Sequence, residues 1–290
     1  MQQQKDDFKS LLLLLGSMVI FGGIGLIRRL IPLPSSVIAM ARGLIGGAAT
    51  FLYFRARGGK LSLRALGKEG PWLVLSGALL GFNWILLFEA YRYTSVAVAT
   101  LCYYMAPILM VLVSPVLFHE RITVKKGICV AVALCGMVLV SGVLREGGAQ
   151  GTRGVLFGLA AAVLYASIVL TNKKLTRTDG LSRTILQLLT AGVVLLPYVL
   201  ITENVTALDW SGSTIPMLLV AGLVFTALTY TMYFTAIPGL RAQTAALGSY
   251  VDPVVAVLVS ALFLHEPMSA AEWIGAALIL GATAVSTIQN

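Results

Sequence analysis

Two charged side chains stand inside long apolar runs, where an isolated charge is costly unless another group pairs with it. Arg42 lies within the run 35–54, and Asp252 lies within the run 241–264. An arginine in such a place could bind the carboxylate of a ligand, or it could pair with an acidic side chain of the protein itself. An aspartate could carry an exchangeable proton, or it could only satisfy backbone groups freed by the neighbouring Pro253.

A set of aromatic and amide side chains shares these apolar runs and could line a common cavity. A buried tyrosine needs a partner for its hydroxyl, and aromatic faces attract organic cations. Tyr104 and Tyr250 each precede a proline by three residues, which favours a shared role for that pair. For any single tyrosine, packing against lipid or a neighbouring helix is the simpler interpretation. Together with Arg42, the candidate substrate-binding residues are Asn83, Trp84, Tyr103, Tyr104, Tyr165, Tyr230, Tyr233 and Tyr250.

The composition of the chain is that of a membrane protein. Of its 290 residues, 58% are hydrophobic and only 11% are charged, and the mean hydropathy is +0.90. A soluble domain typically carries about 25% charged residues. The net charge of +9 does not indicate nucleic-acid binding, because the lysines and arginines cluster between apolar runs and form no stripe interleaved with aromatic residues.

Ten apolar segments are long enough to cross a bilayer as helices, which takes about 20 residues. Backbone polar groups in lipid must be paired internally, and the sequence shows no strand-like alternation, so these segments predict an all-α integral membrane protein. The predicted transmembrane helices are 10–28, 35–54, 71–91, 95–118, 124–143, 153–172, 183–201, 214–235, 241–264 and 271–288.

The chain also contains an internal repeat of half its length. Residues 90–120 align without a gap to residues 236–266. Five helices per copy is an odd number, so the second copy is predicted to be inverted in the membrane, an arrangement typical of secondary transporters. The predicted units are a first repeat at 1–143 and a second, inverted repeat at 153–288, with a linker at 144–152.

The distribution of lysine and arginine supports the inversion. With the N-terminus in the cytoplasm, the cytoplasmic segments hold fifteen of these residues and the external segments hold five. The positive-inside rule therefore predicts both termini in the cytoplasm. Inversion also places His119-Glu120 and His265-Glu266 on opposite faces of the membrane. The zinc site that their residue types suggest is therefore not expected, and both pairs are predicted to be structural contacts at helix ends. Glu89 is predicted to pair with Arg92 near the membrane edge.

A pattern of prolines, acidic residues and glycines accompanies the repeat. It consists of Pro107 followed by Glu120, Asp252-Pro253 followed by Glu266, Gly127, and Ile274-Gly275. With this pattern the chain resembles the EamA family of the drug/metabolite transporter superfamily over nearly its whole length. It departs from the family at Asp252, where glutamate is usual, and at Phe21 and Tyr165, where tryptophan often stands. The resemblance implies ten helices in two inverted five-helix repeats around a central cavity for small metabolites, without an ATP-binding domain.

These features predict a secondary transporter of the cell inner membrane that exports amino acids or related metabolites by alternating access. The alternative is an importer of a quaternary amine such as choline on the same fold, with the tyrosines forming an aromatic box. An intramembrane enzyme would need a catalytic constellation at one depth, and none is apparent in the sequence. The expected partners are a small-molecule substrate, the lipid bilayer and a coupling proton or sodium ion, with Asp252 as the coupling candidate. No cofactor, metal or nucleic acid is expected.

Overall fold

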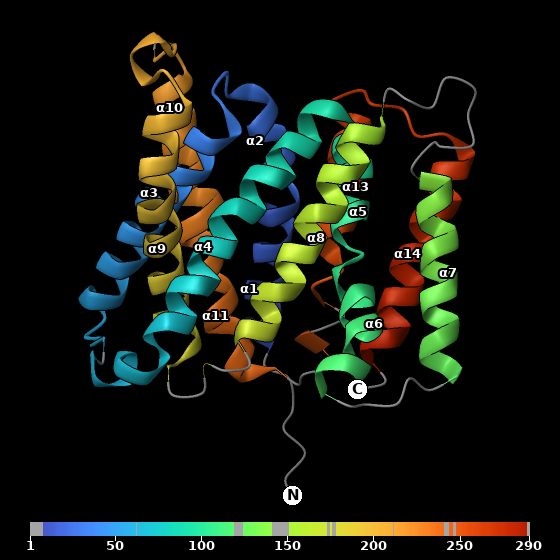
Figure 1. The fold of residues 1–290 in the computed structure, drawn as a ribbon, viewed down its shortest axis with the longest axis horizontal. Helices are drawn as coiled ribbons and strands as arrows, with labels where there is room; N and C mark the ends of the chain where they lie inside the picture. The colour runs from blue at the N-terminus through green and yellow to red at the C-terminus, as the bar shows by residue number, and fades with distance from the viewer. Residues whose placement is uncertain are drawn as a thin grey trace, which may run out of the picture.

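A computed structural model of the chain shows a bundle of helices (Figure 1). It describes residues 8–61, 63–118, 124–140, 151–172, 175, 178–210, 212–240, 244–245 and 248–288. No β-strand occurs within these ranges, in agreement with the all-α prediction. His119, Glu120 and most of the predicted linker 144–152 lie outside the described residues.

The helices of the first half follow the predicted segments, and the first and fourth of these segments are each divided into two helices. Ser95 caps the start of one of them, because its Oγ accepts a hydrogen bond of 3.1 Å from the Val98 nitrogen. The helices are α1 (Phe8–Gly22), α2 (Ile24–Leu30), α3 (Ser35–Ala56), α4 (Leu63–Tyr93), α5 (Val96–Tyr103), α6 (Ala106–Phe118) and α7 (Val124–Val140).

The helices of the second half follow the same order. A π-helix, Leu223–Leu228, joins α10 to α11 within the eighth predicted segment. Asp179 caps the start of α9 by accepting a hydrogen bond of 3.0 Å from the Ser182 nitrogen. The helices are α8 (Thr152–Asn172), α9 (Gly180–Thr202), α10 (Thr214–Gly222), α11 (Thr229–Ala236), α13 (Val251–Leu262) and α14 (Ala270–Ile288).

Several of these helices are long and apolar enough to cross a membrane. Seven helical stretches within the described residues meet that criterion, and three shorter apolar helices lie at Gly127–Val140, Val251–Leu262 and Ala270–Val285. Each of the ten predicted segments overlaps one of these stretches. The chain is therefore a multi-pass helical membrane protein, while the count of ten crossings stays a prediction.

The fourth predicted segment differs from the expectation of one continuous helix. Helix α5 ends at Tyr103 and α6 begins at Ala106, so the chain turns at Tyr104. Pro107 accounts for the break, because proline lacks an N–H group and its ring clashes with the carbonyl four residues earlier. In the second half, α13 likewise begins directly after Tyr250. Tyr104 and Tyr250 therefore lie at helix ends inside the bundle.

The most extensive helix contacts join the first half of the chain to the second. Helix α3 packs on α9, α4 on both α8 and α9, α1 on α11 and α13, α5 on α8 and α13, and α7 on α14. Glycines allow the closest approach: a Cβ atom on Gly43 of α3 would lie 2.7 Å from the backbone nitrogen of Gly192 in α9. The two halves are thus interleaved. The first turn of α1 and the last turn of α14 lie at the same end of the bundle (Figure 1).

Candidate functional site: a charged aromatic cavity

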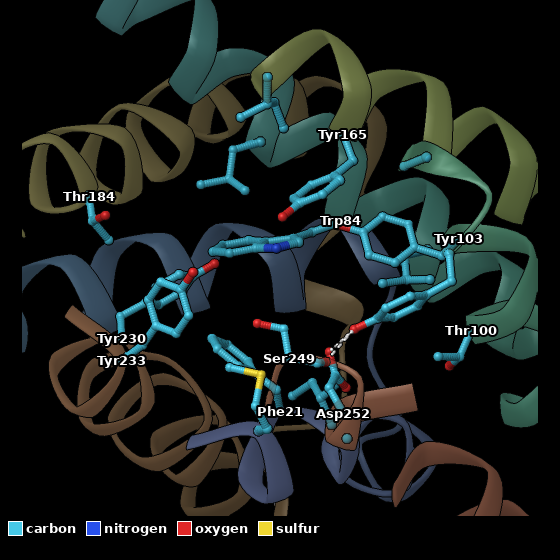
Figure 2. Close-up of a pocket in the computed structure, with 18 of the residues that line it drawn as sticks. Phe21, Trp84, Thr100, Tyr103, Tyr165, Thr184, Tyr230, Tyr233, Ser249 and Asp252 are labelled. Carbon is cyan, nitrogen blue, oxygen red and sulfur yellow. Dashed lines mark hydrogen bonds between the residues drawn. The ribbon is translucent and has the colours of Figure 1, made fainter. Parts of the chain in front are cut away.

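A cavity of about 560 Å³ lies among the helices of both halves. Residues from α1, α2, α3, α4, α5, α6, α8, α9, α11 and α13 line it. Its size falls within the range of about 300–1,000 Å³ that is typical of small-molecule sites. Figure 2 shows aromatic side chains and Asp252 arranged around this space.

Arg42 projects from α3 into the cavity lining and is only 4% exposed. Its guanidinium lies over the ring of Trp84, with 4.3 Å between Cζ and the ring centroid. Nε donates a hydrogen bond of 3.0 Å to Oγ1 of Thr226, and Nη2 donates one of 3.3 Å to the carbonyl of Phe225. Both acceptors belong to the π-helix, an element that is frequent at functional sites. Among the described residues, Nη1 of Arg42 has no hydrogen-bond partner.

Asp252 lies in the first turn of α13, where the helix dipole favours a negative charge. The hydroxyl of Tyr104 donates to its Oδ2 at 2.9 Å, a bond drawn in Figure 2. Tyr104 Oη is also 3.4 Å from the carbonyl oxygen of Ser249. The turn between α5 and α6 is therefore joined to the start of α13 at the cavity wall, by a hydrogen bond between a tyrosine and a carboxyl group.

Arg42 and Asp252 carry opposite charges and line the same cavity, but they do not pair with each other. The ion pairs found among the described residues are Arg29–Glu266 and Arg92–Glu89. The second of these confirms the predicted contact of Glu89 with Arg92 on one face of α4, at 3.0 Å. The cavity lining thus contains an arginine and an aspartate that are not paired with each other.

Aromatic rings form a large part of the remaining wall. The centroids of Tyr103 and Tyr165 are 5.2 Å apart, and those of Tyr104 and Tyr250 are 6.4 Å apart. Phe21 meets Tyr230 edge to face at 5.1 Å. Such rings offer flat apolar surfaces and π faces to a small organic molecule.

The structure brings most of the predicted site residues together at this cavity. Its lining includes Arg42, Trp84, Tyr103, Tyr104, Tyr165, Tyr230, Tyr233, Tyr250 and Asp252. Asn83 is not among the lining residues: it is fully buried and donates to the carbonyl of Ala161 at 2.6 Å. Its Oδ1 lies 3.5 Å from the hydroxyl of Tyr103, so its contact with the site is indirect.

Several lining residues were missed by sequence reasoning, and Arg183 is the most important of them. In the sequence it was counted among the basic residues of the cytoplasmic segment between the sixth and seventh predicted helices. The signal that could have revealed it is its spacing: Arg183 and Gln187 are four residues apart and share one face of α9. Gln187 also lines the cavity, and its amide donates to Oγ of Ser76 and to Oδ1 of Asn172.

An ion pair holds α2 against the segment after α13 at the end of the bundle opposite the first turn of α1 (Figure 1). Nη2 of Arg29 lies 2.6 Å from Oε1 of Glu266 and also donates to the carbonyl of Thr94 at 3.0 Å. Oε2 of Glu266 accepts bonds from the Val96 nitrogen at 2.9 Å and from the Ser260 hydroxyl at 2.6 Å. We call the contacts of Arg29 and Glu266 the end closure. The predicted role of Glu266 as a contact at a helix end is confirmed by this geometry.

Comparison with known proteins identifies the family. A model described as the EamA-like transporter family matches residues 8–142 and again residues 152–288. The chain belongs to this family. Membership of this family, and the transporter names of similar proteins, indicate that the protein is a membrane transporter rather than an enzyme.

The similar curated proteins carry transporter names. The uncharacterized transporter YxxF of Bacillus subtilis is 25% identical over 280 residues, which cover 94% of this chain and 88% of that protein. The uncharacterized transporter YvbV of the same organism is 29% identical over 253 residues, covering 85% of this chain and 80% of the relative. An uncharacterized transporter of Archaeoglobus fulgidus is 26% identical over 227 residues, covering 77% and 79%.

A solved protein structure shares the fold. A crystal structure matches with a TM-score of 0.67 and covers 97% of this chain and 96% of that chain. The two sequences are 22% identical, so the likeness concerns the fold. The EamA chain described here therefore has a helix arrangement that also occurs in an experimentally determined protein.

Proposed function

We propose that this EamA protein is a secondary transporter that exports an amino acid or a related zwitterionic metabolite. The observation that carries the proposal is the separate placement of Arg42 and Asp252 on one cavity wall. Arg42 would bind the carboxylate of the substrate through its unbonded Nη1, and Asp252 would bind the ammonium group. The aromatic rings would cover the apolar part of the molecule.

Two inverted five-helix repeats are the proposed architecture, and the helix contacts support it. When helices of the first half are exchanged for their counterparts in the second, the contact of α4 with α8 becomes that of α11 with α1, and the contact of α6 with α8 becomes that of α13 with α1. The pairs α3–α9 and α7–α14 exchange into themselves. The double match of the family model is a second, independent support. Repeats of this kind are suited to alternating access.

Export is proposed because of where the cavity reaches and where it is closed. Its lining extends to Gly180 and Arg183 at the start of α9, the end of the bundle that also holds the first turn of α1. The distribution of basic residues supports a cytoplasmic location for that end in the inner membrane. The end closure of Arg29 and Glu266 lies at the other end. Substrate would therefore load from the cytoplasm and leave when the end closure opens.

Asp252 is the proposed coupling group. It is a carboxyl group on the cavity wall whose only partner among the described residues is Tyr104, so a proton could reach it when the cavity is hydrated. In this proposal, proton uptake at Asp252 weakens its attraction for the substrate ammonium and couples release to the proton gradient.

Import of a quaternary amine is the second candidate, and the aromatic wall around Asp252 favours it. Two contacts weaken this candidate. The Trp84 ring already carries the guanidinium of Arg42, and the same guanidinium lies 5.3 Å from the Phe88 ring centroid. A lone cation bound there would face an uncompensated arginine.

Counterflow in proteoliposomes tests the proposed function. Vesicles that hold purified protein and an unlabelled amino acid inside should take up the labelled amino acid, whereas choline-loaded vesicles should not exchange choline. Arg42→Gln should abolish the exchange while Glu89→Gln, which alters a charge outside the cavity, should leave it unchanged. Absence of exchange for every amino acid would contradict the proposal, and exchange of choline would favour the second candidate.

A further inference from the structure

The charged residues of the cavity do not balance. Within the described part of the lining, the charged side chains are Arg42, Arg183 and Asp252. Two positive charges therefore face one negative charge. If Asp252 takes up a proton, the excess of positive charge grows, so the sign of the imbalance is the same in either protonation state.

Among the described residues, the groups that hold Arg183 at the cavity are neutral. Its Nη2 donates to the carbonyl of Leu175 at 2.6 Å and to that of Thr178 at 2.9 Å. Its Nε is buried without a hydrogen-bond partner, and Nη1 makes no hydrogen bond to any residue that the structure describes. Carbonyl groups orient the guanidinium but leave its full charge in place.

Two carboxylates lie near Arg183, and neither neutralises its charge. One is near in the sequence, and the other is bonded to a residue that Arg183 contacts. Asp179 accepts its hydrogen bond from the Ser182 nitrogen at the start of α9. Glu69 accepts a bond of 2.6 Å from the hydroxyl of Thr178. Neither carboxylate forms an ion pair with Arg183 among the described residues, and neither belongs to the cavity lining.

Arg42 and Arg183 lie at different depths of the cavity. Gly43, the neighbour of Arg42, packs against the carbonyl of Leu188, and Arg183 lies five residues before Leu188 on α9. With a rise of about 1.5 Å per residue, this places Arg183 about 7.5 Å farther toward the helix start. One cation is therefore inside the cavity and the other is nearer its end at Gly180.

A membrane cavity with an unbalanced charge is unfavourable. Moving an uncompensated ion away from water is costly even after the protein relaxes. A ligand with the opposite net charge removes this cost, and the same field raises its local concentration at the entrance.

We infer that the substrate carries one net negative charge, as an amino acid with an acidic side chain does. The inference rests on the transport function proposed above and narrows its substrate. The α-carboxylate binds Arg42, the ammonium group faces Asp252, and the second acidic group is attracted by Arg183. Neutral and basic amino acids leave the charge of Arg183 uncompensated.

Matched pairs of ligands test the inference, because an acid and its amide differ in charge and hardly in shape. Counterflow of glutamate against glutamine, and of aspartate against asparagine, is measured in proteoliposomes. Thermal stabilisation of the purified protein by the same four compounds is measured in detergent. We expect a kcat/KM at least tenfold higher for each acid than for its amide, and stabilisation by the acids at lower concentration.

Variants of Arg183 identify the source of the preference. Arg183→Gln should lower the ratio of acid to amide at least fivefold, mainly by raising KM for the acid, and Arg183→Lys should retain most of the ratio. Arg57→Gln is the matched control, since Arg57 is an exposed cation outside the cavity. It directly follows α3, whose last turn lies at the same end of the bundle (Figure 1). Thermal unfolding of each variant shows whether it is folded, and the comparison of acid and amide on the unmodified protein decides the question without any variant.

The outcomes separate this inference from the proposed function. Equal transport of acids and amides, or faster transport of amides, overturns the inference and leaves amino-acid transport intact. Exchange of none of the amino acids, with no stabilisation by any, overturns both. Stabilisation by the acids without flux supports the inference about the ligand and overturns transport.

Discussion

The end closure and the cavity both contain arginine and carboxylate side chains, but they use them differently. In the end closure, Arg29 and Glu266 bind each other, and the remaining oxygen of Glu266 is taken by a backbone nitrogen and a serine hydroxyl. In the cavity, Arg42 and Asp252 are held by neutral groups and do not meet. Charges that satisfy each other hold helices together, whereas charges kept apart on a shared wall are available to a ligand.

The largest expected effect comes from removing the cavity cation. Arg42→Gln keeps a donor for Thr226 but loses the charge. Losing one partner of a buried charge pair costs about 2–5 kcal/mol, so we expect substrate affinity to fall at least about 30-fold. Ligand-induced thermal stabilisation measures this effect, with Arg42→Lys expected to retain part of the affinity. Unchanged affinity in Arg42→Gln would show that Arg42 is a structural contact like Arg29.

Asp252→Asn should have the next largest effect. The variant removes the anionic partner of the substrate ammonium, and a hydrogen bond to a charged group contributes about 1.5–3 kcal/mol. We therefore expect affinity to fall roughly tenfold or more. Uptake driven by an imposed proton gradient should be lost, while counterflow at saturating substrate should persist. Gradient-driven accumulation by Asp252→Asn would assign the coupling proton to another group.

Breaking the end closure should make the cavity open more often to the outside. The expected change in free energy is smaller than that for either cavity variant above. Arg29 and Glu266 are partly exposed, with 35% and 20% of the side-chain surface accessible, so their pairing is expected to contribute about 1 kcal/mol. Arg29→Gln, Glu266→Gln and the double variant form a mutant cycle. The readout is labelling of Ser249→Cys, at the cavity wall, by a membrane-impermeant thiol reagent added from the outside, in a background without the native cysteines.

Each single variant of the end closure should raise the labelling rate about fivefold, and the double variant should add little to that. Effects that simply add would show that the two residues act independently. A fall in labelling would place the end closure on the open side of the cavity.

The smallest effect is expected at Asn83, which contacts the site only through Tyr103. Asn83→Ala loses the buried hydrogen bond to Ala161, and such a bond within a membrane bundle contributes about 1 kcal/mol. We expect a lower unfolding temperature with less than about a threefold change in affinity. An affinity loss as large as that of Arg42→Gln would make Asn83 a direct ligand of the substrate.

Much of the site was predictable from the sequence because few polar residues occur in the apolar segments. Arg42 and Asp252 stand out there, and proline spacing drew attention to Tyr104 and Tyr250. All four line the cavity. Arg183 was not predicted, because a basic residue at a segment boundary usually follows the positive-inside rule. Asn83 was predicted to bind substrate because its residue type is polar, but residue type does not reveal which side of α4 it occupies.

The division of the fourth segment shows a different limit. Apolar length alone favours one continuous helix over 95–118, and Pro107 signals a distortion without stating its extent. At this turn the hydroxyl of Tyr104 meets Asp252 of α13 and the carbonyl of Ser249, which lies just before that helix. These contacts come from the other half of the chain.

Scarcity of charge, segment length and the repeated motifs are local properties of the chain, so the amino-acid order was enough to indicate a membrane environment and the family. It also determined which side chains could carry a charge inside the membrane. Only the tertiary structure decided which of them pair. Arg29 meets a carboxylate 237 positions away, whereas Arg42 donates to a π-helix and pairs with no acid in the part of the chain that the structure describes. The physical reason is that helices of the two halves interleave, so the neighbours of a buried charge are set by packing between segments distant in sequence.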